Sequence, residues 1–188
     1  MIIKRDDAFM AVCELRTQID ADKYKIGTGM FVSSPAGDDR FFGWIVTASH
    51  VARETNDNTV IMISTKEGNV AALPLRLFGA IGWKHHSEAD ISVFQIQFNQ
   101  TNEQFMQGRF FPYDHFNLEK KVVSRDYELT SIGFPNGLGT EGLFSPFTFR
   151  SYASSGFVTL PRADTKRNSV FFCLENPSVG GIFRLSCI

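Results

Sequence analysis

The stretch from Gly43 to Ala52 contains a histidine in a position that suits proton transfer. The apolar run from Trp44 to Val46 predicts a buried strand, and His50 follows shortly after it. A histidine at the end of a buried strand is held stiffly but can still face a cleft. Because imidazole groups ordinarily titrate near neutral pH, His50 could accept and return a proton as a general base. The alternative is a loop histidine with a purely structural role.

The residues around this histidine resemble the trypsin-like peptidases of the chymotrypsin fold, in particular many bacterial members. The family's apolar-Thr-Ala-x-His motif is matched by residues 47–50, Thr-Ala-Ser-His. Residues 27–32, Gly-Thr-Gly-Met-Phe-Val, look like the strand that precedes this motif. Residues 88–94 resemble the strand that carries the family's aspartate, which would be Asp90. The resemblance extends roughly from Phe9 to Gly181.

The resemblance implies an enzyme that hydrolyses peptide bonds in peptide or protein substrates. In this family a serine attacks the carbonyl, a histidine moves the proton and an aspartate orients the histidine. His50 would then be the base and Asp90 the orienting carboxylate. The structural alternative for Asp90 is a carboxylate that caps a turn before a buried strand. No cofactor is implied, because the triad mechanism needs none.

The family's nucleophile motif, Gly-x-Ser-Gly-x-Pro, does not occur in the 188 residues. Gly180 and Gly181 stand where the glycines before the serine belong, and the resemblance makes the Gly181 N–H an oxyanion-hole donor. Ser178 precedes this glycine pair instead of following it, so it is a weak alternative nucleophile. Ser186 has no glycine beside it. We therefore expect the 188-residue chain to lack triad activity.

Residues 182–188 are compatible with a shifted reading frame that contains the motif. They can be encoded as ATA-TTC-AGG-TTG-TCC-TGT-ATT, and reading from the second base gives Tyr-Ser-Gly-Cys-Pro-Val. Joined to Gly181, this matches the family's nucleophile motif. The interpretation is a single-base insertion after the Gly181 codon, which would leave the chain truncated or frameshifted before its serine.

Strand-like stretches without a long helical pattern predict an all-β fold. The resemblance implies two six-stranded antiparallel β-barrels, the second incomplete at the C-terminus. The predicted domains are residues 1–104, with His50 and Asp90, and residues 105–188.

Individual elements follow from the local pattern. Residues 9–15 read as a strand, and residues 60–63 and 70–75 as a hairpin. A second hairpin is predicted within residues 147–158. The polar residues 99–108 are predicted to form the crossover between the two barrels.

The composition argues against several classes of function. A net charge of −1 gives no electrostatic basis for binding nucleic acid or an anionic membrane. No apolar run approaches the length of a membrane span, and residues 1–7 are too charged for a secretory signal. Cys13, Cys173 and Cys187 lack metal-ligand spacing, which predicts reduced thiols in a cytoplasmic protein.

Three alternatives stay open at this point. A pseudopeptidase or peptide-binding module would keep the barrels without the nucleophile. A different hydrolase would use Ser178 or Cys187. A metal site at His85 and His86 is disfavoured, because adjacent residues of a strand point to opposite faces.

Overall fold

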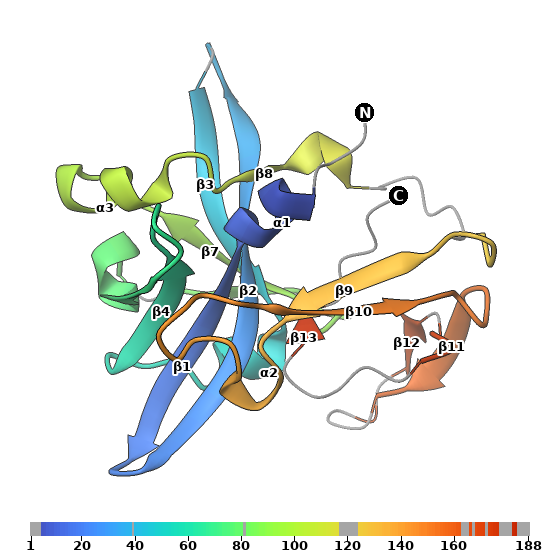
Figure 1. Ribbon diagram of the computed structural model, residues 1–188. Coiled ribbons are helices and arrows are strands. Elements are labelled where there is room, and N and C mark those ends of the chain that lie inside the picture. Colours follow the sequence, from blue (N-terminus) through green and yellow to red (C-terminus); the bar gives the residue numbers. More distant parts are fainter. Residues whose placement is uncertain are drawn as a thin grey trace.

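The chain is built mainly from β-strands, which confirms the predicted all-β fold class (Figure 1). The computed structural model describes residues 5–38, 40–80, 82–116, 124–162, 166, 168–171, 173–176 and 182–183, and the structural statements below concern these residues. No helix in these ranges is long and apolar enough to cross a membrane.

The largest sheet collects the strands of the first half of the chain. Its hydrogen-bonded order is β5-β4-β1-β2-β3-β7-β6, with antiparallel neighbours, and β8 pairs in parallel with β2. The predicted hairpin of residues 60–75 is confirmed as β4 and β5. The bounds are β1 (Val12–Asp20), β2 (Lys23–Gly37), β3 (Arg40–Thr47), β4 (Thr59–Ser64), β5 (Val70–Pro74), β6 (Lys84–His85), β7 (Ser92–Ile96) and β8 (Phe111–Pro112).

The predicted two-barrel description fits the fold, although the described strands of this sheet form an open path and no closed barrel is found. Within the described ranges, no strand pairing joins β5 to β6. β6 contains only Lys84 and His85, and β5 runs directly into a 3-10 helix, η1 (Leu75–Phe78). The β6 edge therefore offers only two residues for such a closure.

The second half forms two smaller sheets. β9 (Leu129–Gly133) lies between β10 (Phe147–Ser151) and β13 (Ile182–Phe183), and β11 (Val158–Pro161) pairs with β12 (Asn168–Phe171). The predicted hairpin within residues 147–158 is wrong, because β10 pairs with β9 and β11 with β12. The intervening chain instead turns toward residue 174, where Ala153 and Leu174 form an isolated bridge.

Short helices connect these strands. Residues 9–11, predicted as part of a strand, belong to helix α1, and β1 begins only at Val12. Ala8 and Val12 are buried against Ile132 and Phe134 of the second half, so tertiary packing overrides the apolar pattern. The other helical segments are α2 (Ser49–Ala52), α3 (Gln100–Met106), η2 (Tyr113–His115) and η3 (Pro135–Gly137).

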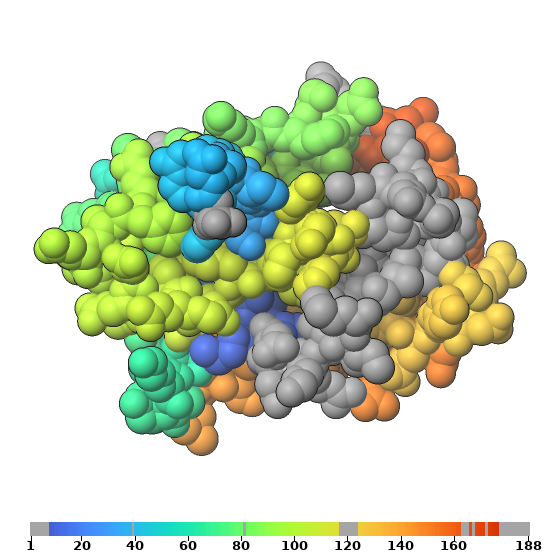
Figure 2. Space-filling view, turned by 90° about the horizontal axis from the view of Figure 1, so that it is seen from above, coloured from blue at the N-terminus to red at the C-terminus, as the bar shows by residue number. Residues whose placement is uncertain are grey.

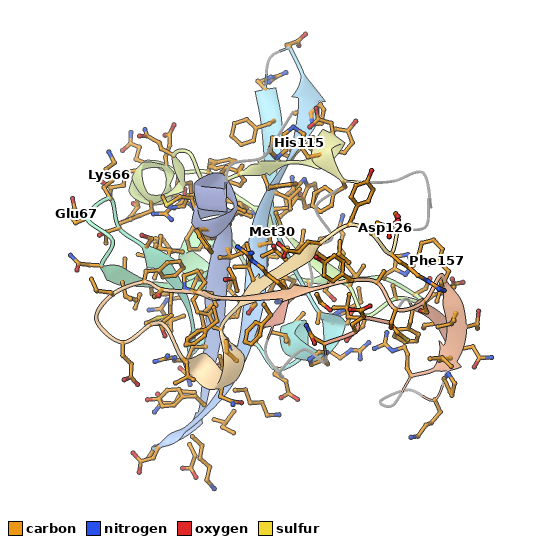
Figure 3. All side chains as sticks on the ribbon, turned by 45° about the vertical axis from the view of Figure 1, so that its right-hand side comes forward. Met30, Lys66, Glu67, His115, Asp126 and Phe157 are labelled. Carbon is orange, nitrogen blue, oxygen red and sulfur yellow. The ribbon has the colours of Figure 1, made fainter. Side chains whose placement is uncertain are left out.

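The hydrophobic core is larger in the first half than in the second. The side chains of the large sheet form a buried cluster that includes Leu15, Phe31 and Phe94. In the second half, Leu129 and Ala153 form a separate small cluster, and Leu174 packs against it. Several large apolar side chains of the second half are exposed, including Phe157, which lies at the periphery in Figure 3. The others are Tyr127, Leu138, Leu143, Phe147, Tyr152, Leu160, Val170 and Phe171.

Aromatic packing holds the tip of the β2–β3 hairpin in place. Phe41 lies 5.6 Å from Phe98 and 5.3 Å from Phe110 between ring centroids. Figure 2 shows this light-blue tip beside the yellow-green segment that contains these two rings. Gly43 allows the close approach, because a Cβ there would lie 2.7 Å from the Phe98 ring and 2.9 Å from the Phe110 ring. The cluster therefore anchors the hairpin whose second strand leads to His50.

A buried polar cluster joins β1 to the loop that follows η3. Glu14 is fully buried, and its two oxygens accept hydrogen bonds from Arg16 at 2.6 Å and from Thr140 at 2.9 Å. Arg16 also donates to the Thr140 hydroxyl at 2.8 Å. Burial raises the pKa of the Glu14 carboxyl, and the bonds from Arg16 and Thr140 counteract only part of this rise.

Replacing Arg16 by alanine should destabilise the fold by about 3 kcal/mol near neutral pH, because it leaves the Glu14 charge buried without its partner. The loss should shrink in acid, since a protonated Glu14 needs no counter-charge. Urea unfolding at several pH values measures this. Lys25→Ala is the matched control, because Lys25 and Glu54 form an ion pair in which each side chain is about half exposed, and its loss should cost under about 1 kcal/mol. Equal losses in the two variants would contradict the prediction.

Candidate active site

The two predicted catalytic residues lie in direct contact. His50 is in α2, directly after β3, and Asp90 lies just before β7. The antiparallel pairing of these strands places Thr47 opposite Ser92, which brings the two residues together. The His50 Nδ1 lies 2.6 Å from the Asp90 Oδ2, and the His50 backbone N–H donates to the Asp90 Oδ1 at 3.0 Å.

This contact determines which imidazole nitrogen is available for chemistry. Burial on its own would raise the pKa of Asp90, but hydrogen bonds from His50 and the charges of His50 and Arg162 outweigh it, so the pKa lies below its usual range. An ionised carboxylate only accepts hydrogen bonds, so the His50 Nδ1 must carry the proton. In the neutral imidazole, Nε2 is then the proton acceptor. The His50 side chain is 64% exposed, which leaves it accessible to a reaction partner.

A hydrogen-bond network around Ser49 fixes the relative position of α2 and the Asp90 loop. Ser49 is buried, and its hydroxyl donates to the Ile91 carbonyl at 2.8 Å and lies 2.7 Å from the Ser92 hydroxyl. The His85 Nδ1 contacts the same Ser92 hydroxyl at 2.6 Å. Sequence reasoning missed this role, because Ser49 occupies the variable position of the Thr-Ala-x-His motif.

His86 shapes the loop that carries Asp90. Its Nδ1 accepts hydrogen bonds from the backbone N–H groups of Glu88 at 3.1 Å and Ala89 at 2.9 Å. His85 and His86 are thus engaged in local contacts. In the described part of the chain, no three histidine, cysteine or acidic side chains form a cluster that could hold a metal ion.

The helix that carries His50 packs closely over β2. A Cβ atom at Gly27 would lie only 2.4 Å from the Val51 Cγ1 and 2.6 Å from its Cγ2. Glycine at position 27 is therefore required for the observed approach of α2 to the strand. The Gly-Thr-Gly pattern of the sequence therefore places a small residue where the helix that carries His50 packs on β2.

Gly27→Ala should displace α2 and destabilise the fold by about 1–3 kcal/mol, the usual cost of overpacking. The amide resonance of His50, whose N–H donates to Asp90, should shift at the same time. Adding Val51→Ala should make room and restore both the stability and the resonance. Gly82→Ala serves as the control, since a Cβ there meets nothing closer than 3.7 Å. If the double variant is no better than the single one, the proposed clash is not the cause.

Comparisons with known proteins support the fold. No protein-family model and no curated protein matches the chain. The solved structure of GrC, a granzyme, matches with a TM-score of 0.50 and 12% identity over 79% of this chain and 62% of that one. The fold is that of the chymotrypsin-like proteases. A second match, tobacco vein mottling virus protease, has a TM-score of 0.40 and 14% identity over 92% of this chain and 64% of the protease. The chain thus spans less than two thirds of either protein.

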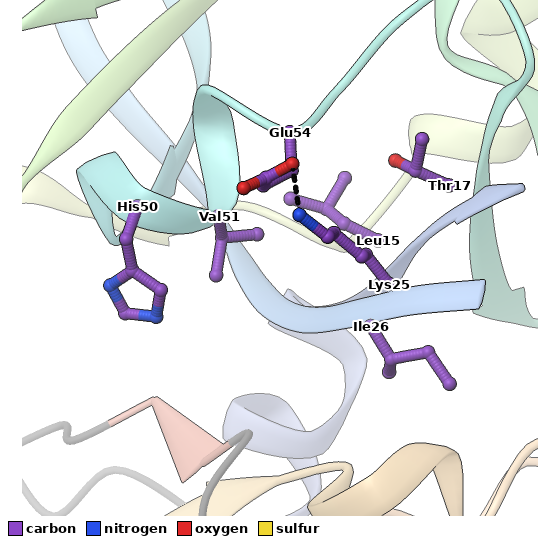
Figure 4. A pocket seen from close by; sticks show the side chains of 7 residues that line it. All are labelled: Leu15, Thr17, Lys25, Ile26, His50, Val51 and Glu54. Carbon is purple, nitrogen blue, oxygen red and sulfur yellow. Dashed lines mark ion pairs between the residues drawn. The ribbon is translucent and has the colours of Figure 1, made fainter. Parts of the chain in front are cut away.

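A hollow of about 300 Å³ opens beside His50 in this chymotrypsin-like fold (Figure 4). Leu15, Ile26 and Val51 provide apolar walls, and Thr17 also lines it. At its rim Lys25 and Glu54 form an ion pair at 2.5 Å, and their charges largely cancel. The hollow can therefore receive an apolar or neutral side chain next to the imidazole.

The described ranges do not include the other predicted site residues. Ser178, Gly181, Ser186 and Cys187 lie outside the described residues. Cys13 is buried in the large core, and this burial raises the pKa of its thiol strongly, so it is no nucleophile. Cys173 is exposed. The chymotrypsin-like fold thus presents His50 and Asp90 as its candidate catalytic groups.

Proposed function

We propose that this chain belongs to a lineage of trypsin-like serine endopeptidases, in which His50 is the general base and Asp90 orients it. The observation that carries the proposal is the 2.6 Å contact between the His50 Nδ1 and the Asp90 Oδ2. These residues lie far apart in the sequence, and the motif resemblance selects them before any geometry is known. The chymotrypsin-like fold is compatible with a protease, but fold alone does not determine function, so the proposal rests on the site.

The proposed mechanism follows from the tautomer of His50. A serine hydroxyl next to the Nε2 would transfer its proton to His50 while its oxygen attacks the substrate carbonyl. The imidazolium would then protonate the leaving amine. Asp90 would stay ionised throughout, since its pKa is already lowered in the folded protein. Backbone N–H groups, with Gly181 as the proposed donor, would stabilise the oxyanion.

The serine itself is proposed to be encoded in a shifted frame after the Gly181 codon. Residues 182–188 are compatible with such a frame, because one set of their possible codons encodes Tyr-Ser-Gly-Cys-Pro-Val when read from the second base. We propose residues 1–104 and 105–188 as the two barrel domains.

Sequencing the genomic DNA across the Gly181 codon and downstream tests the frame directly. An extra base, followed by an open frame that encodes Ser-Gly-x-Pro and further strands, is the expected result. Codons for residues 182–188 that cannot encode this motif in the shifted frame would exclude the frameshift. The peptidase assignment would then depend on activity measurements alone.

A peptide-binding module without catalysis is the second candidate. The hollow beside His50 favours it, because none of the described residues that line this hollow is a serine or a cysteine. The 188-residue chain can be titrated with a peptide library while the NMR signals of the Val51 methyl groups are monitored, and shifts of these signals would detect binding. Saturable shifts in the 188-residue chain, together with an inactive frame-restored protein, would favour the module over the peptidase.

A further inference from the structure

The hairpin of β11 and β12 contacts the Asp90 loop at two points. The Arg162 Nη2 lies 3.1 Å from the Asp90 Oδ1, and the Ser169 hydroxyl donates to the Glu88 carbonyl at 3.0 Å. Arg162 directly follows β11, and Ser169 lies in β12. The second half of the chain thus reaches the carboxylate that contacts His50.

The two oxygens of Asp90 have separate partners. Oδ1 accepts the His50 backbone N–H and faces the Arg162 guanidinium, whereas Oδ2 lies against the His50 Nδ1. A carboxylate held at one oxygen by two donors from different elements cannot rotate freely. We propose that Arg162 is a positioning residue that holds the Asp90 Oδ1 so that Oδ2 stays aligned with the His50 Nδ1. The inference rests on the proposed function only in assigning Asp90 the orienting role.

Burial makes this contact more than a surface ion pair. The Arg162 side chain is 8% exposed and that of Asp90 is 32% exposed. A guanidinium removed from water needs an opposite charge, and a partly buried carboxylate needs donors, so each stabilises the other's position. The exposed pair of Arg150 and Glu128, at 3.5 Å, lacks this enclosure.

The two histidines that precede Asp90 are engaged elsewhere. His85 contacts Ser92, and His86 accepts two backbone N–H groups of the loop. Glu88, on the same loop, carries the carbonyl that Ser169 contacts. The charged groups that act on the Asp90 carboxylate are therefore His50 from α2 and Arg162 from the end of β11. The orienting group of the site is thereby held by both halves of the chain.

Titration of the Asp90 carboxyl carbon by NMR in the 188-residue chain tests the proposal without any need for turnover. Arg162→Gln removes the charge and should shift the Asp90 pKa upward. Arg162→Lys keeps the charge and should restore part of the shift. Arg150→Gln is the matched control and should leave the Asp90 titration unchanged, because Arg150 pairs with Glu128. An Asp90 titration in Arg162→Gln that equals the control would overturn the proposal.

A measurement on the unmodified chain covers the case in which Arg162→Gln fails to fold. The Arg162 side-chain nitrogen resonance should move on acidification with the same midpoint as the Asp90 carboxyl carbon. If the two midpoints differ, Arg162 does not hold Asp90. This outcome can be distinguished from failure of the proposed function. If the two midpoints coincide but the frame-restored protein hydrolyses no peptide, the positioning role of Arg162 stands and the peptidase proposal is rejected.

Discussion

A frame-restored protein should hydrolyse peptide bonds about 10⁶-fold faster than the 188-residue chain, the scale on which loss of a catalytic serine acts in a related mechanism. The physical reason is that His50 and Asp90 already lie in place, with the Nδ1 to Oδ2 distance at 2.6 Å. The 188 residues lack a serine in a Ser-Gly-x-Pro setting that could serve the proposed base. A fluorogenic peptide library and a serine-directed phosphonate label would measure the gain.

The control for this experiment is the same restored protein with the new serine codon changed to alanine. It keeps the added strands but removes the nucleophile, so it separates catalysis from improved folding. Activity of the alanine control should fall to the level of the 188-residue chain. Equal turnover and equal phosphonate labelling in the unrestored chain would contradict the proposed role of the shifted frame.

Asp90→Asn should lower the turnover of the frame-restored protein by about 10⁴-fold, as loss of this carboxylate does in the triad mechanism. The asparagine side chain can turn its NH₂ group or its carbonyl oxygen toward the His50 Nδ1. The NH₂ group would donate to an unprotonated Nδ1, and the carbonyl oxygen is a weaker acceptor than a carboxylate, so the proton is no longer held on Nδ1. His50→Ala should cost about 10⁶-fold, since it removes the base itself. The value of kcat at saturating peptide measures both effects.

Asp126→Asn is the matched control for this pair. Asp126 lies in an exposed turn, where its carboxylate accepts a hydrogen bond from Ser124 at 3.3 Å (Figure 3). The same chemical change there should leave kcat unaltered. Circular dichroism should show that every variant keeps its fold. An Asp90→Asn protein as active as the Asp126→Asn control would remove Asp90 from the mechanism.

Local patterns predicted the parts of the fold that depend on neighbours in the sequence. The β4–β5 hairpin follows from two apolar runs around a polar turn, and it is observed. The strand before His50 follows from its apolar run, and it is observed as β3. The pattern failed at residues 9–11, because Ala8 and Val12 pack on Ile132 and Phe134, which lie far away in the sequence.

Pairing between strands was less predictable than the strands themselves. The alternation in residues 147–158 indicates extended chain but does not indicate its partner, and β10 pairs with β9 instead of β11. Closure of the first sheet likewise depends on whether distant edges meet. Such choices are decided by the packing of whole sheets, and hydrophobic period carries no information about them.

The sequence by itself selected His50 as the candidate base and Asp90 as the candidate orienting carboxylate, because residues 47–50 and 88–94 resemble motifs of the trypsin-like peptidases. Only the tertiary structure decided how the pair is supported. Ser49 ties α2 to the Asp90 loop, and Arg162 reaches Asp90 from the other half of the chain. Neither contact leaves a local pattern, since hydrogen bonds and ion pairs between distant segments depend on the folded path that brings the atoms together.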